Sequence, residues 1–153
     1  MTTELRFSAD TADIDHDRVH LWLSEESYWA RGRPREIHDA AVANSRNYGV
    51  FDESGEQLGY ARVITDGVTF AWLCDVFVAE AARGRGAGVR LISGIVDDLE
   101  PLGIKRMALF TEDAHGLYEK FGFAQLTDAE SWMLRWGAGY GPQPDVDAVH
   151  MPG

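Results

Sequence analysis

The residues best suited to carry chemistry lie in a glycine-rich turn, RGRGAG, at residues 83–88. The turn follows an apolar run that ends near Val78 and precedes a helical pattern that begins near Ala87. A strand-to-helix turn leaves backbone N–H groups unpaired at the positive end of a helix, and glycines let a ligand come close to the backbone. This combination is typical of a phosphate-binding site.

Positive charge gathers around the same turn, on Arg83, Arg85 and Arg90, and would suit a polyanion. Two familiar phosphate motifs are absent. No Gly-Lys-Ser/Thr sequence ends the turn, and Val89 stands where the third glycine of a G-x-G-x-x-G motif would be. The turn alone leaves two interpretations open: a phosphate cradle, or a glycine-rich turn with solvated arginines.

A second arginine-rich stretch repeats the tetrapeptide ARGR at residues 30–33, within ESYWARGRPRE. Tyr28 and Trp29 could form flat apolar walls, while Arg31 and Arg33 could clamp a carboxylate or phosphate through paired N–H groups. The alternative is a helix connection whose arginines pair with neighbouring glutamates. A nucleic-acid site made of arginine and aromatic residues conflicts with the acidity of the rest of the chain.

Asp75 is an acidic residue inside the apolar run WLCDVFV. A carboxylate there is either buried with partners or faces a wet cleft, because an unpaired buried charge is costly. Desolvation would raise its pKa into the range of a general base; a structural role in the strand is the alternative. Glu112, Asp113 and His115 are weaker candidates for proton transfer, since acids are common where helices begin.

Hydrophobic patterns predict the elements that must position these residues. They predict a strand at 5–8, helices at 13–27 and 33–47, and strands at 48–51, 58–65 and 68–78. A helix at 86–103, a strand at 105–111, a helix at 113–123 and a strand at 131–136 come next. This order predicts an α/β (α+β) domain, a mixed sheet with helices on its faces, over residues 1–136. Residues 137–153 form an irregular, Gly- and Pro-rich extension.

The composition is that of a soluble domain with an acidic surface. With 25 acidic and 14 basic residues the formal net charge is −11, so we expect no nucleic-acid and no membrane partner. No apolar run approaches the ~20 residues of a membrane span, and no signal pattern opens the chain. The single Cys74 excludes an internal disulfide and fits a cytoplasmic location. Its histidines and cysteine show no metal-ligand spacing, so no metal is expected.

Two segments together resemble the GNAT superfamily of N-acetyltransferases. VFVAEAARGRGAGVRLI is similar to the family's acetyl-CoA signature, R/Q-x-x-G-x-G/A after a strand, through Arg83, Gly86 and Gly88. TEDAHGLYEKFGF is similar to the family pattern A-x-x-L/F-Y-x-x-x-G-F, with Tyr118 as its tyrosine. The order of elements also matches. The resemblance implies a mostly antiparallel sheet of six to seven strands with splayed central strands and about four helices.

The resemblance also implies roles for particular residues. Tyr118 would protonate the departing thiolate, with Asp75 as a candidate base. The splay would offer pantetheine the main-chain groups of Val76, Phe77 and Val78. The pyrophosphate of coenzyme A would be held at Arg83, Gly84, Arg85, Gly86, Ala87, Gly88 and Val89. The acceptor pocket would be bordered by the loop that contains Tyr28, Trp29, Arg31 and Arg33.

The expected function is therefore transfer of an acetyl group from acetyl-CoA to the amine of a small molecule, which could also carry a carboxylate or phosphate. Two alternatives stay open: an acyl-CoA-binding sensor without catalysis, and a protein or peptide N-acetyltransferase. Tyr118 argues against a pure binder, and the arginine-rich loop argues against a basic peptide. The sequence leaves open whether the protein forms a homodimer.

Overall fold

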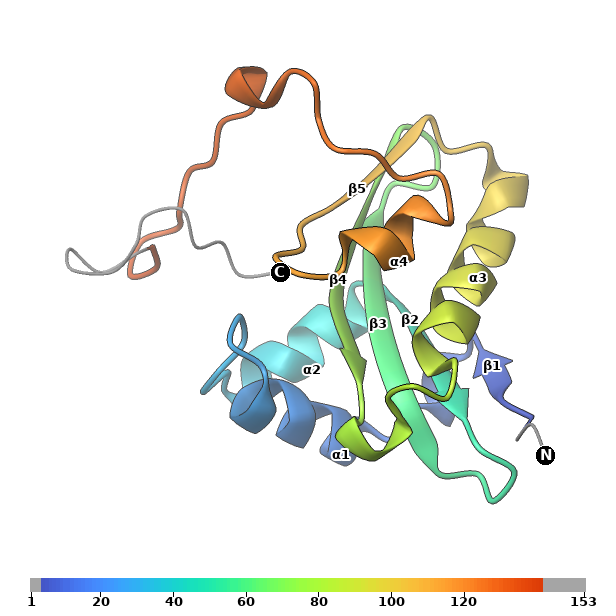
Figure 1. Ribbon diagram of the computed structural model, residues 1–153. Helices are drawn as coiled ribbons and strands as arrows, with labels where there is room; N and C mark the ends of the chain where they lie inside the picture. The colour runs from blue at the N-terminus through green and yellow to red at the C-terminus, as the bar shows by residue number, and fades with distance from the viewer. Residues whose placement is uncertain (1–3, 142–153) are drawn as a thin grey trace.

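The computed structural model describes residues 4–141 and contains a five-stranded sheet with helices on both faces (Figure 1). The strands lie in chain order across the sheet: β1 (Arg6–Ser8), β2 (Arg46–Phe51), β3 (Gln57–Thr65), β4 (Phe70–Val78) and β5 (Arg106–Leu109). Neighbours are antiparallel from β1 to β4, whereas β5 is parallel to β4. A parallel pair needs a crossover connection, which contains α3 (Ala87–Leu99).

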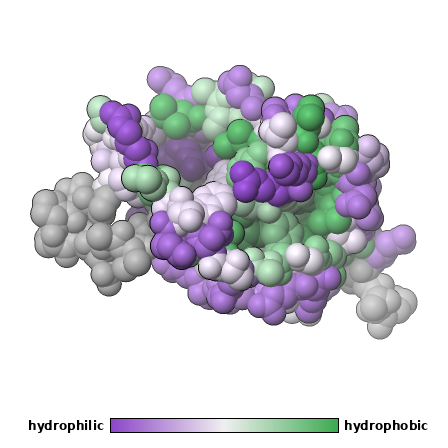
Figure 2. Space-filling view, turned by 90° about the horizontal axis from the view of Figure 1, so that it is seen from above, coloured by the Kyte–Doolittle hydropathy of each residue, from purple (hydrophilic) through white to green (hydrophobic). Residues whose placement is uncertain are grey.

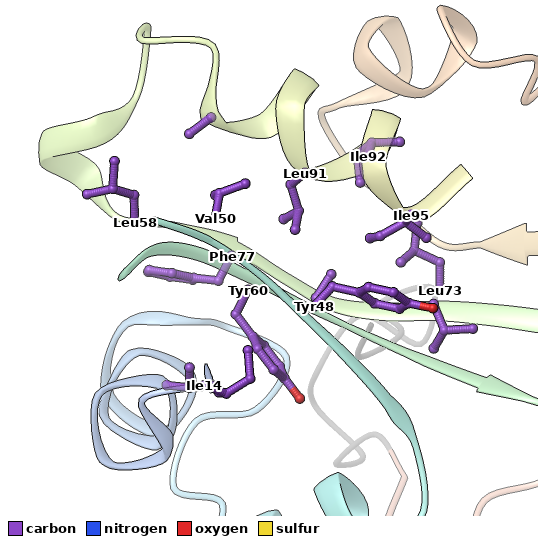
Figure 3. Close-up of a cluster of buried hydrophobic side chains, with 14 of the residues drawn as sticks. Ile14, Tyr48, Val50, Leu58, Tyr60, Leu73, Phe77, Leu91, Ile92 and Ile95 are labelled. Carbon is purple, nitrogen blue, oxygen red and sulfur yellow. The ribbon is translucent and has the colours of Figure 1, made fainter. Parts of the chain in front are cut away.

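The remaining helices are short. The main ones are α1 (His16–Leu21), which continues as a π-helical turn (Trp22–Glu26), α2 (Arg35–Ala43) and α4 (His115–Glu119). Single 3-10 turns lie at Thr11–Asp13, Glu80–Ala82, Glu100–Leu102 and Ala129–Ser131. Figures 1 and 3 show α1 and α2 on one side of the sheet and α3 on the other. None of the helices among residues 4–141 is long and apolar enough to cross a membrane.

The core on the α3 side is built from one helical stripe. Leu91, Ile92 and Ile95 recur at helical spacing, are fully buried and point at the sheet (Figure 3). The ring of Phe7 lies 2.3–2.5 Å from where a Cβ of Gly94 would be, so the first strand packs directly on the helix backbone. Only glycine permits this approach.

The core on the opposite side fixes the helix that leads to the arginine-rich loop. Trp22 stacks on Phe77 of β4, with ring centroids 5.3 Å apart, and Ile14 and Tyr60 are buried beside them. The hydroxyl of Tyr60 donates a hydrogen bond to Asn47 Oδ1 on the neighbouring strand. Because the π-helical turn is anchored on β4, the residues after it are carried to the middle of that strand.

The predicted α/β class is confirmed, and the number of strands is corrected from six or seven to five. The strand predicted at 131–136 is absent: a 3-10 turn ends at Ser131 and the residues after it pair with no strand in the described part of the chain. The helix predicted at 13–27 becomes α1 plus a π-helical turn. Of the predicted extension, residues 142–153 lie outside the described residues.

Candidate functional site

The sheet opens between β4 and β5. The two strands pair from Phe70 with Arg106 to Leu73 with Leu109, and there the pairing ends. β4 continues to Val78, so the main-chain groups of Val76–Val78 have no strand partner on the β5 side among the described residues. An extended ligand can pair with such an edge through backbone hydrogen bonds. The splay expected from the resemblance is present at the expected residues.

A β-bulge lies where the splay begins. Arg62 of β3 pairs with Cys74 and Tyr60 pairs with Phe77, so two residues of β4 face the single Ala61. One of the two is Asp75, which has a φ of +53°. Among residues 4–141 it is the one residue other than glycine with a positive φ. Aspartate tolerates this left-handed conformation better than most residues, but it still needs support from its surroundings.

Asp75 receives that support from four N–H groups. Its carboxylate, 2% exposed, accepts hydrogen bonds from Arg33 at 2.8 and 3.3 Å, from Arg62 Nε at 2.9 Å and from Trp29 Nε1 at 3.0 Å. Arg62 also donates to Ser45 Oγ at 3.1 Å. Two arginines and one carboxylate leave this buried cluster with a net charge of +1.

The expected rise in the pKa of Asp75 is wrong. Burial by itself would raise it, but hydrogen bonds and charge from Arg33 and Arg62 outweigh burial and hold the pKa of Asp75 below its ordinary value. Arg33 likewise has a different partner from those expected, because its guanidinium binds Asp75 and not a neighbouring glutamate, and so is not free to clamp an acceptor anion. The cluster therefore joins the arginine-rich loop to the β4 bulge.

Arg62 and Ser45 are members of this cluster that the sequence analysis missed. A signal existed for Arg62, which stands alone as a charge in the apolar run LGYARVIT. Pairing that run with WLCDVFV across the turn DG would have placed the arginine beside Asp75. Ser45 gave no comparable signal.

The glycine-rich turn has the shape of an anion cradle. Gly84 and Gly86 have φ of +83° and +81°, and a Cβ built on either would meet no atom within 4 Å. Gly86 is the N-cap of α3 and supplies no side chain, so the amides of Ala87, Gly88 and Val89 have no intrahelical partner. These open amides at the positive end of a 13-residue helix fit the diphosphate of coenzyme A.

The arginines around the cradle differ in how they are held. Arg83 donates from Nε to the carbonyl of Val78 at 3.2 Å and lies 5.8 Å from the Phe77 ring, so its position is tied to the end of β4. Arg90 lies over Phe7 at 5.3 Å, toward β1. Arg83, Arg85 and Arg90 are all exposed. Because Arg90 lies over Phe7, Arg83 and Arg85 are better placed to meet a ligand at the turn.

Tyr118 lies on α4 next to the cradle helix. The neighbouring Leu117 is 3.6 Å from where a Cβ of Gly88 would be, which brings α4 onto the first turn of α3. Tyr118 is 7% exposed and packs edge-on against Phe123. Burial, then the negative charge of Asp113, raise the pKa of Tyr118 to about 12. Its hydroxyl is therefore protonated at neutral pH and can donate.

The arginine-rich loop faces the beginning of α4. Tyr28 is 42% exposed and meets Trp29 edge-on, with centroids 5.0 Å apart. Burial and then the charges of Glu112 and Asp113 raise the pKa of Tyr28. Arg31 is exposed and has no side-chain partner in the described part of the chain. The aromatic pair, two acids and Tyr118 thus border one region.

Two histidines, His20 and His38, pack against the end of the arginine-rich loop at Arg33. His20 Nε2 lies 2.7 Å from the carbonyl oxygen of Arg33 and its ring is 5.3 Å from that of His38. His38 is 1% exposed, and its Nε2 has no hydrogen-bond partner within residues 4–141. Burial, followed by the nearby charges of His20 and Arg33, lowers the pKa of His38 to about 4. His38 is therefore neutral at physiological pH.

A family model described as the acetyltransferase (GNAT) family matches residues 16–123. This range is well over half of the 153-residue chain and includes the splay, the cradle and Tyr118. The chain therefore belongs to the GNAT family of acetyltransferases, whose members use acetyl-CoA. The family predicted from the two motifs is confirmed. Within residues 4–141, no group of three or more His, Cys, Asp or Glu residues could hold a metal ion.

Relatives agree with this assignment. A Gibberella zeae protein named as an acetyltransferase is 28% identical, with 74% of this chain aligned to 75% of that one. Serotonin N-acetyltransferase 2, chloroplastic, of Oryza sativa subsp. japonica is 35% identical over 76% of this chain, which spans 46% of the rice protein.

Solved structures share the fold. A GNAT-family protein from Xanthomonas campestris pv. campestris has a TM-score of 0.83 and 35% identity, covering 91% of this chain and 97% of that one. N-acetylglutamate synthase from Neisseria gonorrhoeae, solved with coenzyme A and N-acetyl-glutamate, has a TM-score of 0.65 at 18% identity. It covers 85% of this chain and 30% of that one and shows the fold alone.

Proposed function

We propose that this protein transfers the acetyl group of acetyl-CoA to the amine of a small molecule. The observation that carries the proposal is the convergence of three parts: the open amides of Ala87–Val89, the segment Val76–Val78 with no strand partner on the β5 side, and the buried phenol of Tyr118. A phosphate cradle alone would serve many ligands. The cradle, an open strand edge and a proton donor together suit an acyl thioester.

The cofactor side of the proposal uses backbone groups. The diphosphate would bind at the amides of α3, and the pantetheine arm would extend β4 along Val76–Val78. An amide of that segment would polarise the thioester carbonyl. The open surface at Gly84 and Gly86 supports this assignment, because side chains there would stand in the ligand's path.

The acceptor side of the proposal uses side chains of the loop and of α4. The apolar body of the acceptor would pack against Tyr28 and Trp29, and its ammonium would be attracted by Glu112 and Asp113. The name of the rice relative, a serotonin N-acetyltransferase, supports an amine of this kind. A carboxylate or phosphate on the acceptor would have Arg31 as its exposed partner, since Arg33 already binds Asp75.

The proposed chemistry takes two protons from the nitrogen of the bound ammonium and places one on sulfur. The ammonium first loses a proton through water toward Glu112 or Asp113. The neutral amine then attacks the thioester carbonyl carbon, the C–N bond forms and the C–S bond breaks, and the Tyr118 hydroxyl protonates the thiolate. The second proton leaves the nitrogen through water and reprotonates the tyrosinate. Asp75 has a lowered pKa and two arginine partners, so we propose that it positions the bulge and the loop instead of acting as the base.

The proposal is tested by thiol release from acetyl-CoA with a panel of arylalkylamines, amino acids, amino-phosphonates and polyamines. With the best amine, Tyr118→Phe should lower kcat roughly 10²-fold and leave CoA affinity nearly unchanged. Tyr140→Phe is the matched control, because Tyr140 is 72% exposed and lies outside the site. Stabilisation by CoA without turnover of any amine would instead indicate an acyl-CoA-binding protein.

A further inference from the structure

The buried cluster at the β4 bulge carries more positive than negative charge. Asp75 supplies one carboxylate, and nitrogens of Arg33 and Arg62 lie 2.8 and 2.9 Å from its Oδ2 atom. The side chain of Asp75 is 1% exposed, that of Arg62 11% and that of Arg33 17%. One positive charge inside the protein therefore has no matching anion in the cluster. We call it the unmatched charge.

Three titratable groups packed around the cluster are uncharged at neutral pH. Burial raises the pKa of Cys74 to about 12 and also raises the pKa of Tyr60, so both groups keep their protons. Burial lowers the pKa of His38 to about 4, so this ring is neutral. Burial would also lower the pKa of Arg62, but the field of Asp75 outweighs it and raises that pKa. The unmatched charge is therefore retained.

The unmatched charge lies next to the segment proposed to polarise the thioester. Asp75 immediately precedes Val76–Val78, so roughly 10 Å of extended chain at most separates it from any amide of that segment. In the proposed reaction the carbonyl oxygen becomes negative first and the sulfur becomes negative next, while protons leave the nitrogen through water. A fixed positive charge near this segment stabilises both anions.

Burial makes the unmatched charge more effective than a charge on the surface. Figure 2 shows hydrophilic residues around the margin of the face seen from above, and charges in such exposed positions are screened by water and salt. The cluster lies between β3, β4 and the arginine-rich loop, where screening is weaker. In a chain of formal net charge −11, it gives a local positive potential to a reaction that forms anions.

We propose that the unmatched charge of the Asp75–Arg33–Arg62 cluster stabilises the oxyanion and the departing thiolate of acetyl transfer. The inference rests on the proposed function. Asp75 positions the bulge and holds the two arginines, whereas the arginines act on the reaction through their charge and without contact with the acetyl group. Arg62 is therefore important for a reason other than the stability of the fold.

Neutralisation of Arg62 separates its charge from its structural role. Arg62→Gln keeps an N–H donor beside Asp75 and Ser45 but removes the unmatched charge, and Asp75 retains Arg33 and Trp29 as partners. With the best amine, kcat should fall about tenfold, whereas the KM of that amine and the affinity for CoA should change little. Arg62→Lys keeps the charge without the planar fork and should restore kcat to within about threefold.

Two further variants control for the loss of a charge as such. Arg46→Gln is the matched control, because Arg46 is exposed, lies on β2 and pairs with Asp98 outside the cluster; kcat should not change. Arg33→Gln removes the unmatched charge from the other side of Asp75 and should lower kcat at least as much as Arg62→Gln. It also replaces Arg62→Gln if that variant does not fold. The loss should persist between about 0.05 and 0.5 M salt.

Titration of bound CoA gives a measurement that needs no amine. The CoA thiol would lie where the thioester sulfur lies, so the unmatched charge should lower its pKa. The midpoint of thiolate absorbance against pH should lie roughly one pH unit higher in Arg62→Gln than in the wild-type protein, and Arg62→Lys should restore it.

The results separate this inference from the proposed function. Equal kcat and equal thiol midpoints in the wild-type protein and Arg62→Gln overturn the inference. A loss in Arg62→Lys as large as that in Arg62→Gln overturns it too, because Arg62 would then be structural. A thiol midpoint that depends on the charge at position 62, in a protein that acetylates no amine, supports the inference and contradicts the proposed function. A wild-type protein that binds no CoA overturns both.

Discussion

The two copies of ARGR occupy opposite kinds of environment. At 82–85 the tetrapeptide lies in an exposed turn, where the arginines surround backbone amides that have no intrahelical partner. At 30–33 the same four residues end with an arginine whose guanidinium is bound to the buried carboxylate of Asp75. Identical sequences therefore serve different purposes, and their surroundings decide which. Glycines open the copy at 82–85 to a ligand, and proximity to β4 closes the copy at 30–33 around an internal anion.

Removal of the Asp75 charge should have the largest effect, because it destabilises the ARGR at 30–33 and leaves the ARGR at 82–85 without a change of partner. Asp75→Asn keeps a residue that tolerates positive φ, but it leaves Arg33 and Arg62 buried without a counter-ion. The free energy of unfolding should fall by about 3–5 kcal/mol in urea unfolding. Asp39→Asn, which removes an exposed partner of Arg35, should cost about 1 kcal/mol or less. Equal losses would show that the cluster is no anchor.

Acid should destabilise the ARGR at 30–33, which precedes Pro34, because His38 is buried behind this loop in its neutral form. Its folded-state pKa of about 4 lies below the ordinary value, so the unfolded chain binds the proton more readily. The stability contributed by neutral His38 is complete above about pH 6.5 and falls toward pH 4, by up to about 3 kcal/mol. The lowered pKa of Asp75 acts only below about pH 4. The free energy of unfolding, measured with urea, should fall between pH 7 and pH 4.5. In His38→Leu this dependence on pH should be smaller.

The glycine copy, at 82–85, should respond in ligand binding. Gly86→Ala places a side chain at φ +81°, which costs about 1–2 kcal/mol of stability and shifts the amides of the turn. Gly55→Ala is the matched control, since Gly55 has φ +88°, equally open surroundings and a place in the β2–β3 turn. By calorimetry, CoA affinity should fall about tenfold or more in Gly86→Ala only. Equal affinities in two folded variants would remove the cradle assignment.

Arg31 offers the smallest effect and the finest test. Because Arg31 is exposed and Arg33 is paired, Arg31→Ala should change the free energy of unfolding by less than about 0.5 kcal/mol, and Arg33→Ala by much more. If the acceptor carries an anionic group, Arg31→Ala should raise its KM about tenfold and leave CoA affinity alone. An unchanged KM with such an acceptor would show that Arg31 does not bind it.

Much of the molecule can be predicted from its local patterns. The order of elements, the cradle glycines and Tyr118 are each encoded within one short segment, so periodicity and motif spacing predict them. The surroundings of Asp75 are not encoded this way. Its partners come from residues 29, 33 and 62, and only the bulge brings them together. The direction of its pKa shift depends on those partners, which is why burial alone predicted the wrong sign.

The strand predicted at 131–136 failed for a related reason. Alternating apolar residues describe what a segment can pair with, but not whether a partner lies within reach in the same chain. Here the segment carries the pattern and has no strand neighbour in the described structure. The helix predicted at 33–47 shows the smaller kind of error, since Pro34 is the extended N-cap and β2 already begins at Arg46.

The chain-order arrangement of the sheet has a consequence for how the protein forms. Strands β1 to β4 meet their neighbours in succession, and β2 to β4 are joined by tight turns that need little loop closure. β5 can dock only after the whole α3 crossover has closed, a slower, non-local event. We therefore expect the opening between β4 and β5 to form after strands β2 to β4 have paired. Pulsed hydrogen labelling should find the β2–β4 amides protected before those of β5, so that binding competence appears only after these three strands have formed.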